Sequence, residues 1–264
     1  GGGGVWLSCG LQGLVQAVPQ NHTHATLLVR GDGIGAALAA WGDKFRAWTG
    51  KLPATAADVT TPGPPVDVTL SHLGYWTDRG GYYYASALGG YSSKEQALSA
   101  VLDRYDSAGY PLRYMQLDDW WFEQGPGGDF DGLVRWLPPL AVNFNSNTSI
   151  FPSESFDWLG ETAAALYVAM MYANNSYTDP RYEWAVDTDQ RYSVPQSRSF
   201  YDDLFLNGSL AVTGGLALFE QDFMSCWAGQ TIIGLCGSDF LVRDVSTASN
   251  WLSSMDAAAM DAGV

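Results

Sequence analysis

The sequence predicts an α/β fold, namely about the first four units of a (β/α)8 (TIM) barrel preceded by the end of a β-sandwich. Apolar runs with strand composition alternate with segments of helical periodicity, which is typical of a parallel sheet. Of the 264 residues, 47% are hydrophobic and 16% are charged, so a sizeable core is expected. We place a boundary near residue 65, with the sandwich end and a linker in 1–65 and the incomplete barrel in 66–264.

The first 65 residues contain two kinds of pattern. The runs 5–7 and 25–29 are rich in strand-forming residues and are broken by Gly, Pro and Asn, which predicts a hairpin. From 33 to 49 apolar residues recur at steps of three and four, which predicts a helix. The glycines of 31–35 indicate a turn into that helix rather than a nucleotide-binding loop, because no βαβ unit surrounds them. The stretch 50–66, rich in Pro, Thr and Ala, is expected to be a linker.

Strand and helix patterns alternate after residue 65. Four strands are expected, at 68–76, 112–117, 165–170 and 216–221. One helix begins after the cap Ser93 and runs through Arg104, and another spans 245–262. Gly263-Val264 is expected to begin a fifth strand, and long loops are expected before the third and fourth strands. An open doubly wound sheet and a closed barrel both fit, but no Gly-x-Gly-x-x-Gly follows the first strand, so a dinucleotide site loses its main support.

Charge limits the classes of partner. The formal net charge is −15, which argues against nucleic acid and against an anionic membrane surface, since both require basic residues. No apolar run is long enough to span a bilayer. A neutral or cationic small molecule fits better. The aromatic content of 14% is compatible with rings that stack on sugars, although many of these rings could simply be core.

Cysteines and sequons bear on cofactors and localisation. The three cysteines are too few and too scattered for a disulfide framework or a zinc site, and no His/Cys/Asp spacing suggests a metal. We expect neither a metal nor a cofactor. Asn-x-Ser/Thr sequons favour the secretory pathway, with an extracellular, lysosomal or vacuolar destination, and they occur at Asn21, Asn147, Asn174 and Asn207. The chain opens on four glycines without a signal-peptide pattern, and we expect it to be a fragment that begins within a domain.

Acidic residues follow three of the four predicted strands. Asp78 follows the first, Asp118-Asp119 the second and Asp222 the fourth. In a barrel the carboxyl ends of all strands open onto the face that holds the active site. Any single Asp is adequately explained as a helix cap. Grouped carboxylates repel one another, however, so the set, interleaved with aromatic residues, favours a sugar-binding site.

Two of these segments resemble motifs of a known group of enzymes. Tyr-Met-Gln-Leu-Asp-Asp-Trp-Trp at 114–121 resembles the Asp-Asp-Gly-Trp or Asp-Asp-Cys-Trp signature at the second barrel strand of the α-galactosidase clan. That clan of glycoside hydrolases includes α-galactosidases, raffinose synthases and related α-glucosidases. Leu-Phe-Glu-Gln-Asp-Phe-Met at 218–224 resembles its fourth-strand motif, usually Lys-x-Asp, whose Asp is the nucleophile. The segment 41–76 resembles the junction between sandwich and barrel in the same group.

The resemblance implies a retaining α-glycoside hydrolase. Asp222 would attack the anomeric carbon, and a second carboxyl, about 5 Å away, would protonate the leaving oxygen. A further set of residues is then expected to bind the sugar through hydroxyl contacts or ring stacking: Asp78, Asp118, Asp119, Glu220, Trp76, Trp120 and Trp121. Which tryptophan stacks is open. In the clan the acid/base lies on the sixth strand, so we assign it to no residue and expect this segment to be inactive alone.

Two departures from the clan matter. Glu220 stands where the clan has Lys, which replaces a positive donor by a negative acceptor unless Arg79 or Arg113 pairs with it. This puts galactose as the substrate in doubt. Trp120 takes the position of the signature Cys, so Cys226 lacks its clan partner, and pairing with Cys236 is open. A transglycosidase of the raffinose-synthase type and a non-catalytic carbohydrate-binding relic are the alternatives. The sugar, the linkage and the oligomeric state are not predicted.

Overall fold

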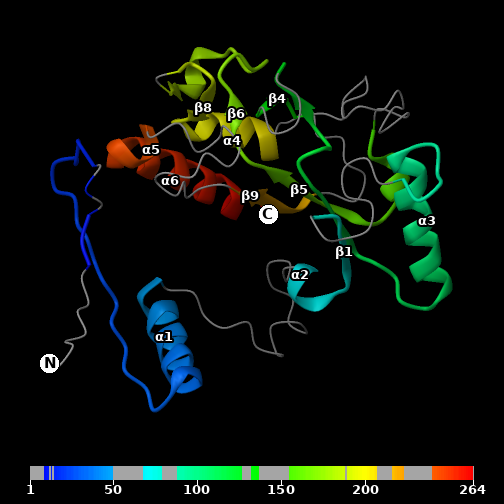
Figure 1. The fold of residues 1–264 in the computed structure, drawn as a ribbon, viewed down its shortest axis with the longest axis horizontal. Coiled ribbons are helices and arrows are strands. Elements are labelled where there is room, and N and C mark those ends of the chain that lie inside the picture. The colour runs from blue at the N-terminus through cyan, green and yellow to red at the C-terminus, as the bar shows by residue number, and fades with distance from the viewer. Residues whose placement is uncertain are drawn as a thin grey trace, which may run out of the picture.

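A computed structural model describes residues 9–11, 13, 15–49, 68–78, 88–126, 132–136, 155–187, 189–206, 216–222 and 240–263. This part of the chain forms a mixed α/β fold with a four-stranded parallel sheet and a second, five-stranded sheet (Figure 1). The parallel sheet confirms the predicted class. The described residues show neither a closed barrel nor a β-sandwich.

The parallel sheet contains the four strands that the sequence pattern predicts, and their bounds are Gly74–Trp76 (β1), Tyr114–Leu117 (β2), Ala163–Val168 (β5) and Leu216–Gln221 (β9). The strands lie in the order β1-β2-β5-β9, and every neighbouring pair is parallel. A doubly wound sheet reverses its strand order at a switch point. These four strands follow chain order without a reversal.

Side chains of the sheet alternate between two faces. One face is apolar and fully buried, because Met115, Leu117, Leu166 and Val168 have no exposed surface. Residues paired across neighbouring parallel strands point the same way, and the register aligns Gln116 with Ala165 and Tyr167 with Glu220 on the other face. Gln116, Tyr167 and Glu220 therefore lie on the same side of the sheet.

Helices lie at both edges of this sheet. Lys94–Ser107 (α3) lies near β1, whereas Arg198–Phe205 (α4), Phe240–Arg243 (α5) and Val245–Ala262 (α6) lie on the β9 side (Figure 1). The indole Nε1 of Trp251 on α6 donates a hydrogen bond of 2.8 Å to the hydroxyl of Tyr201 on α4. Tyr201 also packs edge-to-face on Phe219 of β9, with 6.2 Å between ring centroids. Helix α4 thus connects α6 to the sheet.

Capping residues mark the helix boundaries, and one of them is Ser93, the cap that the sequence predicts. The backbone N–H of Gln96 donates to the side chain of Ser93 at the start of α3. Asp244 caps α6 in the same way, and α6 ends at Gly263, whose φ of 73° places it in the left-handed region that glycine tolerates. Ile34–Thr49 (α1) confirms the helix predicted after the glycine-rich turn. The expected fifth strand is wrong at Gly263, which caps a helix, and Val264 lies outside the described residues.

The expected long loops are wrong, because they contain a second sheet. Its strands are Glu123–Gln124 (β3), Leu133–Arg135 (β4), Met171–Tyr172 (β6), Trp184–Val186 (β7) and Tyr192–Pro195 (β8), in the order β3-β4-β6-β8-β7. Single 3₁₀ turns occur at Asp157–Leu159 (η1) and Pro180–Tyr182 (η2). Tyr182 and Trp184 pack edge-to-face on Phe200 of α4. These segments therefore form a layer of their own beside the parallel sheet.

The first predicted strand and the predicted hairpin need correction. Val68–Ser71 (α2) is a single helical turn, closed by the bond from the His72 N–H to the Val68 carbonyl, so only the end of the predicted strand is β. The run 25–29 is not a strand. The run 5–7 and the linker with its boundary near 65 lie outside the described residues. Across the described residues, no helix has the length and apolar character needed to cross a membrane.

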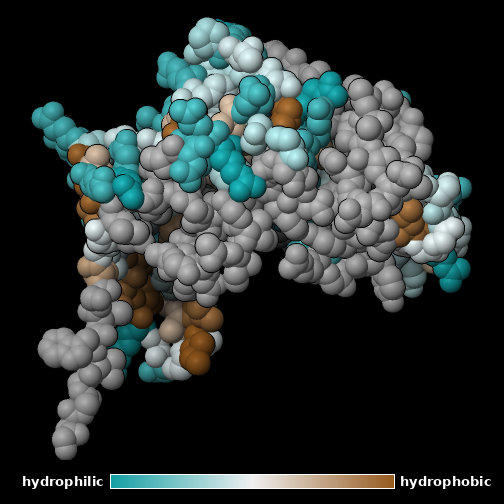
Figure 2. Space-filling view, turned by 45° about the horizontal axis from the view of Figure 1, so that its top comes forward, coloured by the Kyte–Doolittle hydropathy of each residue, from teal (hydrophilic) through white to brown (hydrophobic). Residues whose placement is uncertain are grey.

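Helix α1 has an exposed apolar stripe. None of its residues is buried, and the stripe consists of Ile34, Leu38, Trp41, Phe45 and Trp48. Brown side chains on the lower part of the molecule in Figure 2 belong to this region. Trp41 and Phe45 stack on each other, with 5.0 Å between centroids. The helix is therefore amphipathic in the way the sequence predicts, with its apolar stripe facing outward.

Candidate functional site

The carboxyl ends of the parallel strands bring the predicted acidic residues together. Asp78 follows β1 and Asp118 follows β2. Glu220 is the penultimate residue of β9, and Asp222 comes directly after this strand. The negative charges of three nearby carboxylates raise the pKa of Glu220, and these are Asp118, Asp222 and Asp78. Carboxylates from three different strand ends thus share one site, as the spacing along the sequence predicts.

Gln116 lies at the centre of this site. Its Nε2 donates to Asp118 Oδ2 at 3.0 Å and to Glu220 Oε2 at 2.9 Å. Its Oε1 accepts a hydrogen bond of 3.0 Å from the backbone N–H of Thr77. The Thr77 hydroxyl donates to the Gln116 carbonyl at 2.9 Å. One fully buried amide therefore connects the strand ends of β1, β2 and β9.

Asp118 is buried and well supplied with donors. Its Oδ1 accepts from the backbone N–H of Asp119 at 2.9 Å, and Gln116 donates to its Oδ2. Burial nevertheless raises the pKa of Asp118 above its ordinary value, and the nearby carboxylate of Asp78 adds to the rise, while the hydrogen bonds act in the opposite direction. Desolvation is the largest cause, so this carboxylate is costly to ionise where it stands.

Glu220 is half-buried and has a neutral partner. Burial is the main reason that its pKa is raised, and Asp118, Asp222 and Asp78 raise it further, against the hydrogen bond from Gln116. Arg113, one of the cations considered for Glu220, instead lies 3.9 Å from Glu161. Arg79 lies outside the described residues. The carboxylate of Glu220 therefore accepts a hydrogen bond from the neutral amide of Gln116.

Asp222, the candidate nucleophile, is exposed. Its backbone N–H donates to the Val168 carbonyl at 2.9 Å, which extends the pairing of β5 and β9 by one residue. Tyr167 of β5 is buried beside it. Burial, the carboxylate of Asp222 and then those of Asp118 and Asp119 raise the pKa of the Tyr167 phenol, and a hydrogen bond to Asp222 contributes. The phenol thus stays protonated next to the candidate nucleophile.

The three candidate stacking tryptophans differ in exposure. Trp76 at the end of β1 is 41% exposed, whereas Trp120 and Trp121 are fully buried. The Trp121 Nε1 donates to the Tyr167 carbonyl at 2.8 Å, and its ring meets Trp136 edge-to-face at 4.6 Å. Of the three, Trp76 offers a ring surface to solvent in this structure. Trp121 is a buried packing residue that is hydrogen-bonded to the backbone of β5.

Two further residues near the site have little or no exposed surface. Asp119 is buried, and its carbonyl accepts from Gln124 Nε2 of β3, which links the site to the second sheet. Lys94, the first residue of α3, is buried with its Nζ 4.9 Å from the Trp120 ring centroid. Burial lowers the pKa of Lys94 to about 7. A lysine at a helix start gives no sequence signal of burial, since lysine is almost always exposed.

Sequence reasoning missed Gln116, Thr77 and Tyr167 as members of the site. Gln116 and Tyr167 lie inside predicted strands, on the face opposite to the buried apolar residues. A polar residue at an alternate position of an otherwise apolar strand is the signal that could have indicated them. Thr77 carries no such signal.

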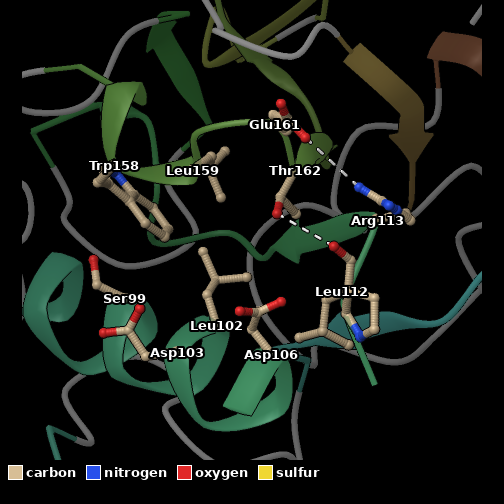
Figure 3. A pocket seen from close by; sticks show the side chains of 11 residues that line it. Ser99, Leu102, Asp103, Asp106, Leu112, Arg113, Trp158, Leu159, Glu161 and Thr162 are labelled. Carbon is tan, nitrogen blue, oxygen red and sulfur yellow. Dashed lines mark hydrogen bonds and ion pairs between the residues drawn. The ribbon is translucent and has the colours of Figure 1, made fainter. Parts of the chain in front are cut away.

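A hollow of about 290 Å³ lies at the opposite end of the sheet. Figure 3 shows α3 on one side of it, with Asp103 and Asp106, and Trp158 and Thr162 on the other side. Arg113 and Glu161 form their ion pair at its edge. None of the predicted site residues lines this hollow, so the candidate site rests on the carboxylate cluster and not on the hollow.

The described residues contain no group of three or more His, Cys, Asp or Glu side chains arranged to hold a metal ion. Comparisons with protein-family models, with curated proteins and with solved structures found no match for the chain. A functional assignment therefore depends on the geometry of the strand ends and on the two short motifs.

Proposed function

We propose that the protein is a retaining α-glycoside hydrolase of the α-galactosidase type, acting on α-linked galactosides or related sugars. The observation that carries the proposal is the convergence of Asp78, Asp118 and Asp222 on Glu220, which brings carboxylates from three strand ends into one group. Packing does not explain such a group, because each carboxylate makes its neighbours harder to ionise. The resemblance of the motifs at 114–121 and 218–224 supports the same function.

The proposed chemistry begins at Asp222. Its carboxylate attacks the anomeric carbon, the bond to the leaving group breaks with its electron pair, and a covalent glycosyl-enzyme forms, which water then hydrolyses. Positive charge develops on the sugar ring in the transition state. Asp118 and Glu220 lie close enough to Asp222 to stabilise that charge. The acid/base residue is assigned to none of the described side chains.

The residues around Asp222 define the proposed sugar subsite. Carboxylates are strong acceptors, so Asp118, Asp119 and Glu220 are the proposed partners of sugar hydroxyls, with Asp78 at the edge. Trp76 is the proposed stacking ring, because it is the exposed one of the three candidates. Glu220 accepts where the clan's Lys donates, so the sugar must present a hydroxyl donor at that position. Galactosides and glucosides are both to be compared.

The same proposal includes the finer fold. We propose that β1, β2, β5 and β9 are the first four strands of a (β/α)8 barrel. Their order without reversal supports this, since a barrel places consecutive strands side by side. The polar face with Gln116, Tyr167 and Glu220 would then point into the barrel, and the apolar face would point to the helices.

The test is the hydrolysis of aryl α-galactosides and α-glucosides with activated leaving groups, which depart without protonation. The full-length protein should release the aryl alcohol from one of them, and Asp222→Asn in that protein should abolish the release. Asp256→Asn is the matched control, because Asp256 is an exposed residue of α6 away from the site. Release that survives in Asp222→Asn would remove the nucleophile assignment.

A carbohydrate-binding relic of a hydrolase is the second candidate. The neutral partner of Glu220, in a site where the clan has Lys, favours it. This candidate predicts that the wild type and Asp222→Asn bind the sugar equally in calorimetric titrations and that neither turns over. Transfer of the glycosyl group to an added acceptor sugar, without free sugar release, would instead indicate a transglycosidase of the raffinose-synthase type.

Passage through the secretory pathway is part of the proposal. Asn21 and Asn174 are exposed, so the structure leaves both sequons accessible to glycosylation, whereas Asn147 and Asn207 lie outside the described residues. The mass of the protein isolated from its native source should decrease on treatment with an N-glycanase. An unchanged mass would count against this localisation.

A further inference from the structure

Gln116 occupies a position from which it cannot touch a sugar. Its side chain is fully buried at the end of β2, below the carboxylates that it contacts. Its partners, in contrast, include the half-buried Glu220, which can reach a ligand. Any influence of Gln116 on a bound sugar must therefore act through these carboxylates.

The orientation of the Gln116 amide is determined by Thr77. A backbone N–H can only donate, so the group that faces the Thr77 N–H at 3.0 Å must be the carbonyl oxygen Oε1. The NH₂ group then has to face Asp118 Oδ2 and Glu220 Oε2, and its two hydrogens match these two acceptors. All the polar atoms of the side chain are thus used in one arrangement.

The hydrogen bond from Gln116 to Glu220, called the bridge below, passes over a neighbouring strand. In the sheet β5 lies between β2 and β9, and the residue of β5 aligned with Gln116 is Ala165. Ala165 is fully buried and points to the same face. Its single methyl group leaves room for the Gln116 side chain to reach Glu220, and a larger side chain there would separate the two.

We propose that Gln116 is a positioning residue that holds Asp118 and Glu220 together as one hydroxyl-binding unit and thereby determines how the site orients its sugar. The inference rests on the proposed glycosidase function. Glutamine suits this role because it combines an acceptor for Thr77 with a donor group that has two hydrogens. A glutamate at 116 would place a third negative charge beside the pair, and an asparagine would be one methylene too short to span from β2 to β9.

Three variants test the bridge. Gln116→Met keeps the length but removes the amide, Ala165→Leu blocks the path without changing a polar group, and Gln116→Glu/Glu220→Gln exchanges donor and acceptor. The first two should lower kcat/KM for the aryl glycoside about 10- to 100-fold, mainly through KM, as expected for lost buried hydrogen bonds to charged groups. The exchange should recover part of this loss, because it restores the link between positions 116 and 220.

Further measurements separate positioning from folding and from the proposed function. Gln20→Met, at an exposed position, is the control, and urea unfolding shows that each variant is folded. The acidic limb of the kcat/KM profile should shift in Gln116→Met and return in the exchange variant. Unchanged kcat/KM and pH profile in folded Gln116→Met and Ala165→Leu would overturn the proposal.

A sugar-independent readout keeps the two proposals distinguishable. The side-chain NH₂ resonances of Gln116, assigned by their absence in Gln116→Met, should move with the protonation of Glu220 and Asp118 in NMR titrations. If the wild type turns over no glycoside and these resonances still titrate, the glycosidase proposal fails and the bridge stands. Resonances that do not respond to pH, or that respond equally in Glu220→Gln, would overturn the bridge.

Discussion

The two ends of the parallel sheet differ in how their charged side chains are buried and paired. At the carboxyl end, Asp118 and Glu220 are buried or half-buried, and a neutral amide connects them. At the amino end, Arg113 and Glu161 form an ion pair at 3.9 Å with side chains 45% and 96% exposed. Water screens the second pair, whereas burial makes the first group costly to ionise. Because burying Asp118 and Glu220 makes them costly to ionise, their presence points to a functional site. The exposed pair Arg113–Glu161 needs no functional explanation.

The largest effect on stability should come from Trp121, the buried tryptophan that contacts β5 near its carboxyl end. Trp121→Ala removes a fully buried indole, its hydrogen bond to the Tyr167 carbonyl and its contact with Trp136. We expect the free energy of unfolding to fall by about 3–5 kcal/mol. Urea denaturation measures this loss. The control is Trp48→Ala on α1, at 64% exposure, which should change stability by less than about 0.5 kcal/mol. Equal effects would contradict the account.

A smaller effect should come from the polar connection at the same end. Thr77→Val keeps the shape but removes the hydroxyl that donates to the Gln116 carbonyl and accepts from the Asp118 N–H at 3.3 Å. The loss in unfolding free energy should be about 1–3 kcal/mol, because buried groups lose their partners. Thr247→Val is the matched control, since its hydroxyl bonds Asp244 at a less buried helix start. A neutral Thr77→Val would show that the connection carries little stability.

The pH dependence of stability should distinguish the buried carboxylates of the carboxyl end from an exposed carboxylate elsewhere. The raised pKa values of Asp118 and Glu220 mean that the folded state binds these protons more tightly than the unfolded state. Their contribution to stability is therefore complete at acidic pH and is lost as pH rises through the raised pKa values. Asp118→Asn should accordingly gain stability relative to the wild type as pH rises towards neutral. Asp256→Asn should show no such trend in the same melting series.

The smallest effect should be at the amino end. Arg113→Ala removes the exposed partner of Glu161, and the expected change in unfolding free energy is between zero and about 1 kcal/mol. It should vanish in high salt, because exposed pairs are screened. A loss as large as that of Thr77→Val would remove the contrast between the two ends of the sheet.

Parts of this architecture follow from the sequence because their patterns are long. The fourth strand and the helix Val245–Ala262 have the predicted bounds, and acidic residues after apolar runs indicate the strand ends. Val68–Ser71 misleads, because β-branched residues close to a strand form a helical turn instead. The second sheet escapes detection because its strands have two to four residues, too few for periodicity.

The carboxylates of the site were predictable, and the groups that connect them were not. Asp118 and Asp222 come directly after strands and Asp78 comes one residue later, and the shared edge of a parallel sheet brings them together. Gln116 connects to Glu220 across 104 positions of the chain, and this contact depends on the register of three strands. Sequence alone does not specify that register. The burial of Trp120 and Trp121 likewise depends on the second sheet and its neighbours.

The most direct test of the central claim is covalent trapping of the candidate nucleophile. A 5-fluoro-α-galactosyl fluoride or its gluco counterpart donates its glycosyl group and loses fluoride without needing an acid. Intact-protein mass spectrometry should show one added glycosyl group, peptide mapping should place it on Asp222, and Asp222→Asn should remain unlabelled while Asp256→Asn is labelled. Labelling of another carboxylate, or sugar binding with no label at all, would contradict the account.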